Sequence, residues 1–437
     1  MADLKPFRAI RYNPDHFANL SAVIAPPYDV LDEAGKAKLL ARSPQNIVEI
    51  DLPYLPPKAV GPDAVYEKAA RTLAGWIDSG VLKQDGQPAI YAYTQSFSIR
   101  GKMFDRRGLI ALVKLEDFST PDHPTSVVPH ERTYRGPIED RMKLMAATGV
   151  QLSPIFGLFP DTQDEICSAL YANLGRPDAE GVLDNVGNKL WAVTDPAVQQ
   201  RVVEATKSRH VYIADGHHRY TTALGYKRQL EDKHGPLPAD HPANYCLFVL
   251  VNMNDPGCVI LPTHRIVGGL KSFYLDTLKE KLAGTFHIAE AEGDESTIAE
   301  FSDGLVNQGP NTFGLFDGKT RKLYTLRLVR PDVLQSYEPD FSADWRSLDV
   351  SILRRYLLDE IIGPTFAGGG EVQLAYTADP EQVPLMADGE KYPLAILLQP
   401  TPLVALEQLG KHGEVMPQKS TYFYPKLATG IAINPIR

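Results

Sequence analysis

The sequence predicts a mixed α/β protein, and three patterns support this fold class. Residues 89–100 and 106–115 alternate like paired strands joined around Gly101. The apolar run 211–214 reads as a strand, and a helical pattern follows it at once. Residues 63–80 carry apolar side chains at helical spacing. Strands and helices therefore alternate along the chain, as in sheets covered by helices.

The remaining elements are assigned from proline positions and from the spacing of apolar residues. In the first part of the chain they are a rigid turn at 25–30, a helix at 32–42, a strand at 46–52, a helix at 139–149, a strand at 153–159 and a helix at 162–173. They continue with strands at 189–193, 209–214, 244–253, 259–266, 394–398 and 420–434, and with helices at 196–206, 219–233 and 349–362. Residues 270–340 alternate helix and strand with more polar content, which indicates an insertion or subdomain.

Composition limits the classes of protein to consider. The chain has 437 residues, a formal net charge of -9 and 43% hydrophobic residues, enough for two or three domains with ordinary cores. The acidic balance argues against a nucleic-acid partner. We expect a cytoplasmic protein with no membrane partner, because the sequence shows neither a signal peptide nor a long apolar run. Cys167, Cys246 and Cys258 lack the pairing of a disulfide framework or a zinc site.

The segment 208–226 carries the strongest functional signal. An apolar strand ends at Ala214, and an Asp-Gly-His-His-Arg run leads directly into a helix. Glycine allows the sharp turn, and the first amides of the helix carry the positive end of its dipole, where anions bind. Arginine adds a planar donor fork, and each histidine adds one donor when neutral or two when protonated. The predicted nucleotide-phosphate site consists of Asp215, Gly216, His217, His218 and Arg219.

Two other interpretations of this run stay open. It can be a turn capped by Asp215 with both histidines exposed. It can also hold a metal, with Asp215, His217 or His218 as a ligand. Adjacent histidines point away from each other on a helix, so a metal site would need distant ligands.

A second cluster, Val127 to Thr133, precedes the predicted helix at 139–149. Here Glu131 stands between His130 and Arg132. A carboxylate in such surroundings can act as a general base if the fold brings a substrate hydroxyl within reach. We therefore predict Glu131 and His130 as catalytic residues, with a solvated surface carboxylate as the alternative.

Three further segments are weaker candidates for substrate or anion binding. His264 and Arg265 end a buried strand, where cations need a ligand or a carboxylate; the alternative is a core salt bridge to Asp349 or Asp359. Asp29 follows the turn of two prolines. The run 416–426 mixes cations, hydroxyls and rings that can hold phosphate and stack a base, or pack as an edge strand. From it we predict that Lys419, Ser420 and Thr421 close the phosphate site.

These segments also resemble known families. The order of His130-Glu131, a helix, the strand around Pro154-Ile155 and the Asp-Gly-His-His-Arg turn resembles the ParB/sulfiredoxin-like fold. The turn, with 5–9, 25–30, 260–265 and 416–426, also resembles the family called domain of unknown function 1015, sometimes labelled SerC-like. This resemblance implies a ParB/sulfiredoxin-like nucleotide-binding core at 121–268, flanked by α/β segments at 1–120 and 269–437.

Differences among the branches of that fold narrow the expected activity. Sulfiredoxins carry a catalytic cysteine where this chain has His217, which excludes their chemistry. Partitioning proteins read DNA, and no basic helix-turn-helix follows the turn here. Free-serine kinases have a glutamate at the position that Glu131 matches. The resemblance therefore implies a nucleotide-dependent kinase of a small hydroxylated metabolite, with free serine as the leading acceptor and ATP or ADP, or another nucleotide, and Mg²⁺ as cofactors. A regulatory protein that binds or hydrolyses nucleotide and a metal-dependent hydrolase are the alternatives.

Overall fold

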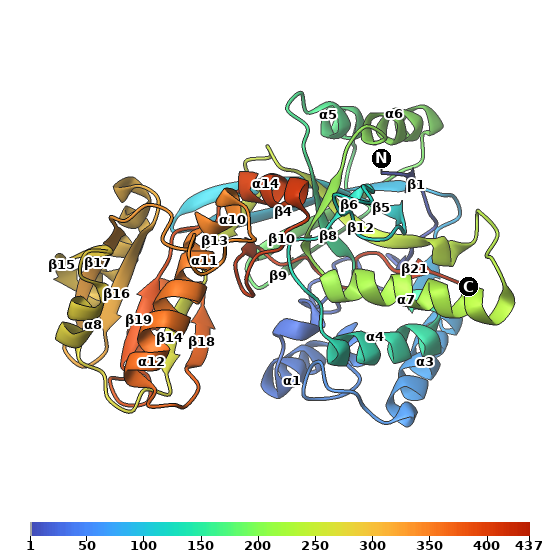
Figure 1. Cartoon of the computed structure of the whole chain (residues 1–437). Helices are drawn as coiled ribbons and strands as arrows, with labels where there is room; N and C mark the ends of the chain where they lie inside the picture. The colour runs from blue at the N-terminus through green and yellow to red at the C-terminus, as the bar shows by residue number, and fades with distance from the viewer. Residues whose placement is uncertain (1) are drawn as a thin grey trace. The chain divides into compact units, whose positions relative to one another are not determined.

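The computed structural model describes residues 2–437, and the chain divides into two compact units (Figure 1). Unit 1 comprises Met1–Val259 together with Pro425–Arg437, and unit 2 comprises Ile260–Tyr424. Strands from the predicted segments 1–120 and 121–268 pair in one sheet of unit 1. The two units therefore do not coincide with the three predicted segments, because the sheet joins the first two of them.

A nine-stranded sheet forms the centre of unit 1, in the order β6-β11-β8-β12-β5-β4-β10-β9 with β1 beside β5. β6 is parallel to β11 and β8 is parallel to β12, while the other neighbours are antiparallel. This mixture confirms the predicted mixed α/β class. The strands are β1 (Leu4–Lys5), β4 (Ile90–Ile99), β5 (Lys102–Lys114), β6 (Val127–Val128), β8 (Ile155–Phe159), β9 (Ala179–Leu183), β10 (Val186–Val193), β11 (Val211–Asp215) and β12 (Tyr245–Asn252). Two small sheets pair β2 (Ile10–Tyr12) with β3 (Leu82–Gln84) and β7 (Val150–Gln151) with β21 (Asn434–Pro435).

Helices cover both faces of this sheet. α7, α4 and α3 lie side by side on one face, and α5 and α6 lie on the other (Figure 1). β12 is buried along its whole length because it is central and covered on both sides. The helices of unit 1 are α1 (Glu33–Arg42), α2 (Val48–Asp51), α3 (Asp63–Asp78), α4 (Arg135–Thr148), α5 (Glu165–Tyr171), α6 (Pro196–Thr206) and α7 (His217–His234). Short 3₁₀ turns occupy Tyr28–Val30 and Pro242–Asn244.

Two predicted strands are wrong in detail. The predicted strand at 46–52 instead contains the helical turn α2 at Val48–Asp51, which starts where the side chain of Asn46 accepts from the amide of Val48 at 3.0 Å. The predicted late strand at 420–434 is reduced to β20 (Tyr422–Tyr424) and β21. Apolar content alone therefore does not distinguish a buried helical turn from a strand.

Unit 2 contains an antiparallel six-stranded sheet, in the order β15-β17-β16-β19-β14-β18. Its strands are β14 (His264–Gly268), β15 (Phe286–Asp294), β16 (Thr312–Asp317), β17 (Lys322–Leu328), β18 (Gln373–Thr377) and β19 (Leu394–Leu397), and β13 (Val259–Leu261) precedes them. Its helices are α8 (Leu275–Leu282), α9 (Ile298–Gly304), α10 (Ala343–Arg346), α11 (Asp349–Ser351), α12 (Gly363–Phe366), α13 (Val383–Met386) and α14 (Val404–His412). Short 3₁₀ turns occupy Glu295–Thr297, Leu305–Gln308 and Pro380–Gln382. The predicted helix at 349–362 forms, and Ile352–Ile362 adopts the wider π-helical form.

Within residues 2–437, no helix has both the length and the apolar composition that crossing a membrane requires.

Candidate functional site

The predicted phosphate-binding turn lies in unit 1, between β11 and α7. Asp215 ends the strand and His217 begins the helix. Gly216, between them, has φ 98° and ψ 24°, a left-handed conformation that glycine adopts without strain. The first bond inside the helix runs from the amide of Tyr220 to the carbonyl of Gly216, at 3.0 Å. The amides of residues 217–219 therefore precede the helical ladder and point along the axis away from the helix.

Parallel pairing brings the second predicted cluster to the same turn. Because β6 and β11 are parallel, they end at the same edge of the sheet, and the residues that follow them become neighbours. The amide of His130 donates to Nε2 of His217 at 3.1 Å, and the two rings pack edge to face with centroids 4.6 Å apart. Glu131 follows His130 in the chain. The predicted catalytic residues and the predicted phosphate turn thus meet within one unit.

Hydrogen bonds fix the tautomers of the two buried imidazoles. Nε2 of His217 accepts an amide proton, so the neutral ring carries its own proton on Nδ1. Nδ1 of His130 donates to the carbonyl of Ile213 at 2.6 Å, because a carbonyl can only accept. Burial lowers the pKa of His130 to about 4. Burial and the neighbouring His130 hold the pKa of His217 well below its usual value. Both rings are therefore neutral at pH 7.

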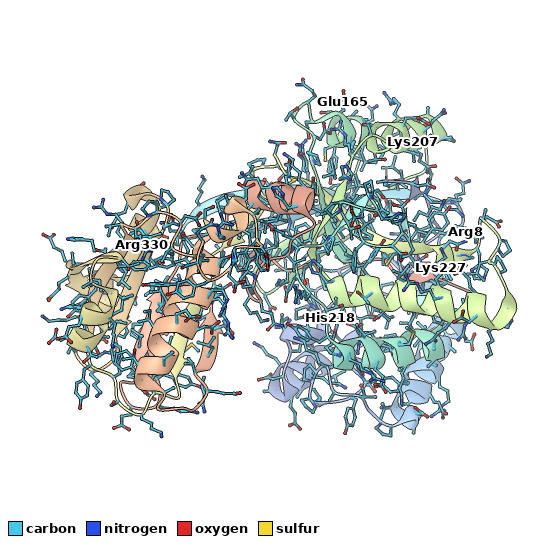
Figure 2. The ribbon with its side chains drawn as sticks, in the orientation of Figure 1. Arg8, Glu165, Lys207, His218, Lys227 and Arg330 are labelled. Carbon is cyan, nitrogen blue, oxygen red and sulfur yellow. The ribbon has the colours of Figure 1, made fainter. Side chains whose placement is uncertain are left out.

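His218 is half-buried at the start of α7 (Figure 2). Its Nε2 accepts from the amide of Tyr134 at 3.0 Å. Burial and then the charge of Lys58 lower the pKa of this ring, while Asp29 opposes the shift. Asp29 lies near Lys58, with 3.9 Å between its Oδ2 and the lysine Nζ. Asp29 is thus part of the charged surroundings of His218, and its role in substrate or anion binding stays a prediction.

The predicted metal alternative has a specific difficulty. Nε2 of His217 and Nε2 of His218 each accept a backbone amide, so neither atom can bind a metal while those bonds exist. Over residues 2–437, no group of three or more histidine, cysteine, aspartate or glutamate side chains gathers closely enough to hold a metal ion.

Arg219 bonds to protein groups of its own unit. Nη1 donates to the carbonyl of Pro154, and Nη2 lies 3.8 Å from Oδ1 of Asp215. The guanidinium folds back against the turn, since a Cβ on Gly216 would lie 3.0 Å from its Cζ. Only 11% of the side chain is exposed. The guanidinium therefore connects the turn to Pro154, the residue before β8.

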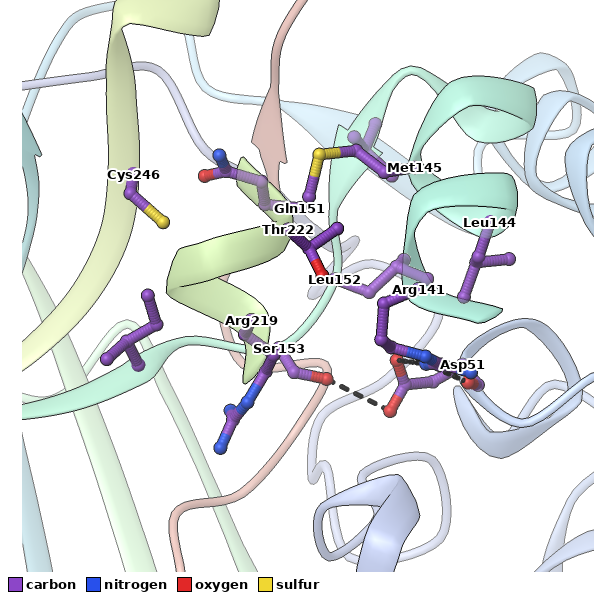
Figure 3. Close-up of a pocket in the computed structure, with 12 residues that line it drawn as sticks. Asp51, Arg141, Leu144, Met145, Gln151, Leu152, Ser153, Arg219, Thr222 and Cys246 are labelled. Atoms are coloured by element: carbon purple, nitrogen blue, oxygen red, sulfur yellow. Dashed lines mark hydrogen bonds and ion pairs between the residues drawn. The ribbon is translucent and has the colours of Figure 1, made fainter. Parts of the chain in front are cut away.

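A small cavity lies behind this arginine, between β8, α4 and α7 (Figure 3). Its volume of about 40 Å³ suits a few water molecules and is far too small for a nucleotide. On one side, Ser153 donates to Oδ2 of Asp51 at 2.9 Å, and Arg141 lies 3.2 Å from Oδ1 of the same carboxylate. Burial raises the pKa of Asp51 although Arg141 opposes the shift. This ion pair and Arg219 line the same cavity.

The carboxylate of Asp215 binds a lysine from the C-terminal segment. Nζ of Lys426 donates to its Oδ2 at 2.9 Å. Burial alone would raise the pKa of Asp215, but Lys426 and then Arg219 hold it well below its usual range. Asp215 is therefore an ion-paired carboxylate at neutral pH. Two cations beside it make it a poor ligand for Mg²⁺.

Predicted site residues His264, Arg265 and Ser420 belong to unit 2, where they form hydrogen bonds with backbone groups of the same unit. His264 accepts the amide of Leu398 at its Nδ1, at 3.2 Å. Arg265 donates to the carbonyls of Thr263 and Lys419, the latter at 3.0 Å, and burial lowers its pKa to about 10. The predicted alternative of a salt bridge from Arg265 to Asp349 or Asp359 is not seen: Asp349 bonds to Asn311, and Asp359 bonds to Arg355.

Residues 419–421 do not form the strand from which their roles were predicted. Lys419 is exposed in a turn with φ 59°, and β20 begins only at Tyr422. Ser420 is buried; its hydroxyl donates to the carbonyl of Pro417, and its own carbonyl accepts from Thr401 at 2.7 Å. The strand predicted at 420–434 therefore does not begin at Ser420. That these residues close the phosphate site stays a prediction.

One family model matches this chain over residues 4–351; its description is "Protein of unknown function (DUF1015)". The chain belongs to the DUF1015 family. No curated protein matches this DUF1015 chain.

Among solved structures, this DUF1015 protein is similar to a free serine kinase in complex with AMP, at 14% identity and a TM-score of 0.33, over 70% of this chain and 90% of that one. A conserved hypothetical protein from Pyrococcus furiosus matches at 14% identity and 0.30, over 72% and 95% of the two chains. SbnI from Staphylococcus aureus, truncated at its C-terminus, matches at 11% and 0.35, over 73% and 85%.

Sequence reasoning on this DUF1015 chain missed the contact between Lys426 and Asp215. The segment 416–426 was singled out for its cations and rings, yet the lysine chosen from it was Lys419. Lys426 follows Pro425 and lies beyond the predicted triplet, so no local pattern marked it. Its partner carboxylate is 211 residues away in the sequence.

Proposed function

We propose that this protein is a nucleotide-dependent phosphotransferase acting on a small hydroxylated metabolite. The observation that carries the proposal is the meeting of His130-Glu131 with the turn at Gly216 on one edge of the sheet, through the bond from His130 to His217. A phosphotransferase needs an anion cradle beside a group that can take a proton from the acceptor. The first amides of α7 and the carboxylate of Glu131 would serve these two functions within one unit.

The roles follow from the geometry. Phosphate oxygens would accept from the first amides of α7, at residues 217–219, and from the Nδ1–H of a neutral His217. Neutral imidazoles suit this role, because their donor strength does not change with pH near neutrality. Glu131 would be the general base. Mg²⁺, where the reaction uses it, would arrive on the nucleotide's phosphates and not on Asp215, whose charge is already balanced.

Free serine is the first acceptor to test, because the resemblance implies that Glu131 matches the glutamate of free-serine kinases. Asp29 is the remaining candidate for substrate binding in this unit, since it lies among the charges around His218. His264 and Arg265 are not assigned to the acceptor, because they hold the backbone of unit 2.

A panel of nucleoside mono-, di- and triphosphates in a thermal-shift assay, with and without Mg²⁺, tests the binding half of the proposal. The nucleotides that bind are then incubated with serine and related hydroxylated acids, and the products are identified by ³¹P NMR. Binding followed by a phosphorylated acceptor supports the phosphotransferase. Binding without transfer supports the regulatory alternative, and absence of any binding refutes both.

A further inference from the structure

Lys426 brings a cation to the predicted phosphate turn from a remote part of the chain. Its Nζ lies 2.9 Å from Oδ2 of Asp215, the residue immediately before Gly216. The side chain is 19% exposed, so it is mostly desolvated but not sealed. A partly desolvated ammonium interacts more strongly with an anion than an exposed one does, because water screens it less.

Two buried side chains fix the backbone that carries this lysine. Nε2 of Gln95 donates to the carbonyl of Lys426 at 3.1 Å, and Nη2 of Arg106 donates to the carbonyl of Pro425 at 2.7 Å. Gln95 lies on β4 and Arg106 on β5, in the body of the sheet. Both are almost wholly buried, and burial lowers the pKa of Arg106 to about 10. Burying an arginine is costly, and among its contacts are the carbonyl of Pro425 and the side-chain oxygen of Gln95.

Arg219, by contrast, is committed to the protein. Its guanidinium bonds to the carbonyl of Pro154 and lines the small cavity behind the turn. A second cation at the turn would add to the charge that balances an incoming phosphate. An ammonium group donates three hydrogen bonds, so it can hold a carboxylate and an anion at the same time.

We propose that Lys426 is a phosphate ligand of this site, held for that task by Asp215, Gln95 and Arg106. The inference rests on the proposed function, because it presumes that the turn binds phosphate. The ligand class is the polyphosphate chain of a nucleotide, which presents several charged oxygens to a point cation. Asp215 is then a positioning residue and does not touch the ligand.

The effects of substitutions on phosphate affinity differ between a purely structural ion pair and a phosphate ligand. If the pair only stabilises the turn, Asp215→Asn and Lys426→Met remove the same contact and weaken phosphate binding to the same extent. If Lys426 is a ligand, Lys426→Met weakens binding, whereas Asp215→Asn does not, because the asparagine oxygen can still accept from Nζ and a negative charge beside the phosphate is removed. The two substitutions therefore separate the two roles.

The experiment measures the affinity of the full chain for ATP and for tripolyphosphate by calorimetry; tripolyphosphate makes the test independent of the base. Lys426→Met should weaken both by about 10- to 100-fold, the range for a lost charged hydrogen bond. Lys426→Arg keeps the charge and should lose less than Lys426→Met. Lys227→Met is the matched control (Figure 2): it lies on α7, 21% exposed and 3.8 Å from Glu231, and should leave both affinities unchanged.

The outcomes distinguish failure of the proposed function from failure of the proposed role of Lys426. A wild-type chain that binds neither probe refutes the proposed function, and this inference with it. If the wild type binds and a folded Lys426→Met variant binds with equal affinity, the inference alone is refuted. The inference is also refuted if Asp215→Asn loses as much affinity as Lys426→Met. If Lys426→Met fails to fold, the double variant Asp215→Asn/Lys426→Met carries no unpaired charge. Compared with Asp215→Asn, it must then show the same 10- to 100-fold loss.

Discussion

The stability of unit 1 should fall as the pH drops from 7 to 5, because His130 is neutral and buried in the folded protein. Its pKa of about 4 lies below the 6.5 of an exposed histidine. Between these values the unfolded chain binds a proton that the folded chain does not, so stability rises with pH and is lost on acidification. From pH 7 to pH 5 this one residue should cost about 2 kcal/mol of unfolding free energy.

His217 should add to the loss, since its pKa is lowered as well. Asp215 should not contribute over this range. Its pKa lies below the usual value, so its stabilising effect is present above about pH 4 and is lost only in stronger acid. The dependence between pH 7 and pH 5 should therefore report on the paired imidazoles and not on the carboxylate beside them.

The test compares the wild type with His130→Asn, whose amide can replace the Nδ1–H donor to Ile213 but does not titrate. Urea denaturation at pH 7, 6 and 5, followed by hydrogen exchange in peptides of β11, reports on unit 1. His123→Asn, at an exposed position of the same unit, is the control. The readout is the change in stability with pH, so any constant loss caused by the substitution cancels. Equal pH dependence in wild type and His130→Asn would refute the assignment of a buried neutral His130.

Three other predictions concern the site. Glu131→Gln keeps the shape but removes the proton acceptor, so nucleotide affinity measured by calorimetry should stay within a few fold while transfer falls by about 10²–10⁴; transfer at the wild-type rate would exclude Glu131 as the base. Arg219→Ala should weaken nucleotide binding by about 1.5–3 kcal/mol and also lower stability in urea by about 1–3 kcal/mol, because the carbonyl of Pro154 loses its charged donor; unchanged affinity would remove it from the phosphate site. Lys419→Gly relieves a left-handed backbone and should keep the fold by circular dichroism; unaltered nucleotide and acceptor kinetics would make this turn scaffold.

The turn at Gly216 was predictable from the sequence for a local reason. An apolar strand, a glycine and a helix start are neighbours in the chain, so their geometry depends little on the rest of the fold. The parallel pairing of β6 with β11 was not predictable from spacing. The placing of Glu131 beside the turn rested on family resemblance, and no local signal required it.

The partners of each polar group were harder to predict than its position. Histidine next to arginine at a helix start indicates donors, and the structure does place them there. However, Nε2 of both histidines accepts an amide, and Arg219 points inward to Pro154. Such choices depend on which carbonyls and amides distant strands supply. Since the net gain of one hydrogen bond is only about 1 kcal/mol, sequence composition does not determine them.

The segment that contains Lys419 and Lys426 shows why the position of a side chain is hard to predict from the composition of its segment. Density of cations and rings marked 416–426, and a strand was predicted over 420–434. Alternation holds only while the backbone stays extended, and Lys419 leaves that region with φ 59°. The chain becomes a strand at Tyr422 and returns to unit 1 at Pro425, where Gln95 and Arg106 hold the next two carbonyls. A lysine fixed at its backbone and ion-paired at its tip has a defined position, whereas an exposed turn lysine does not. A phosphate ligand must be held in a defined position, and for that reason we propose Lys426 as the source of the positive charge at this site.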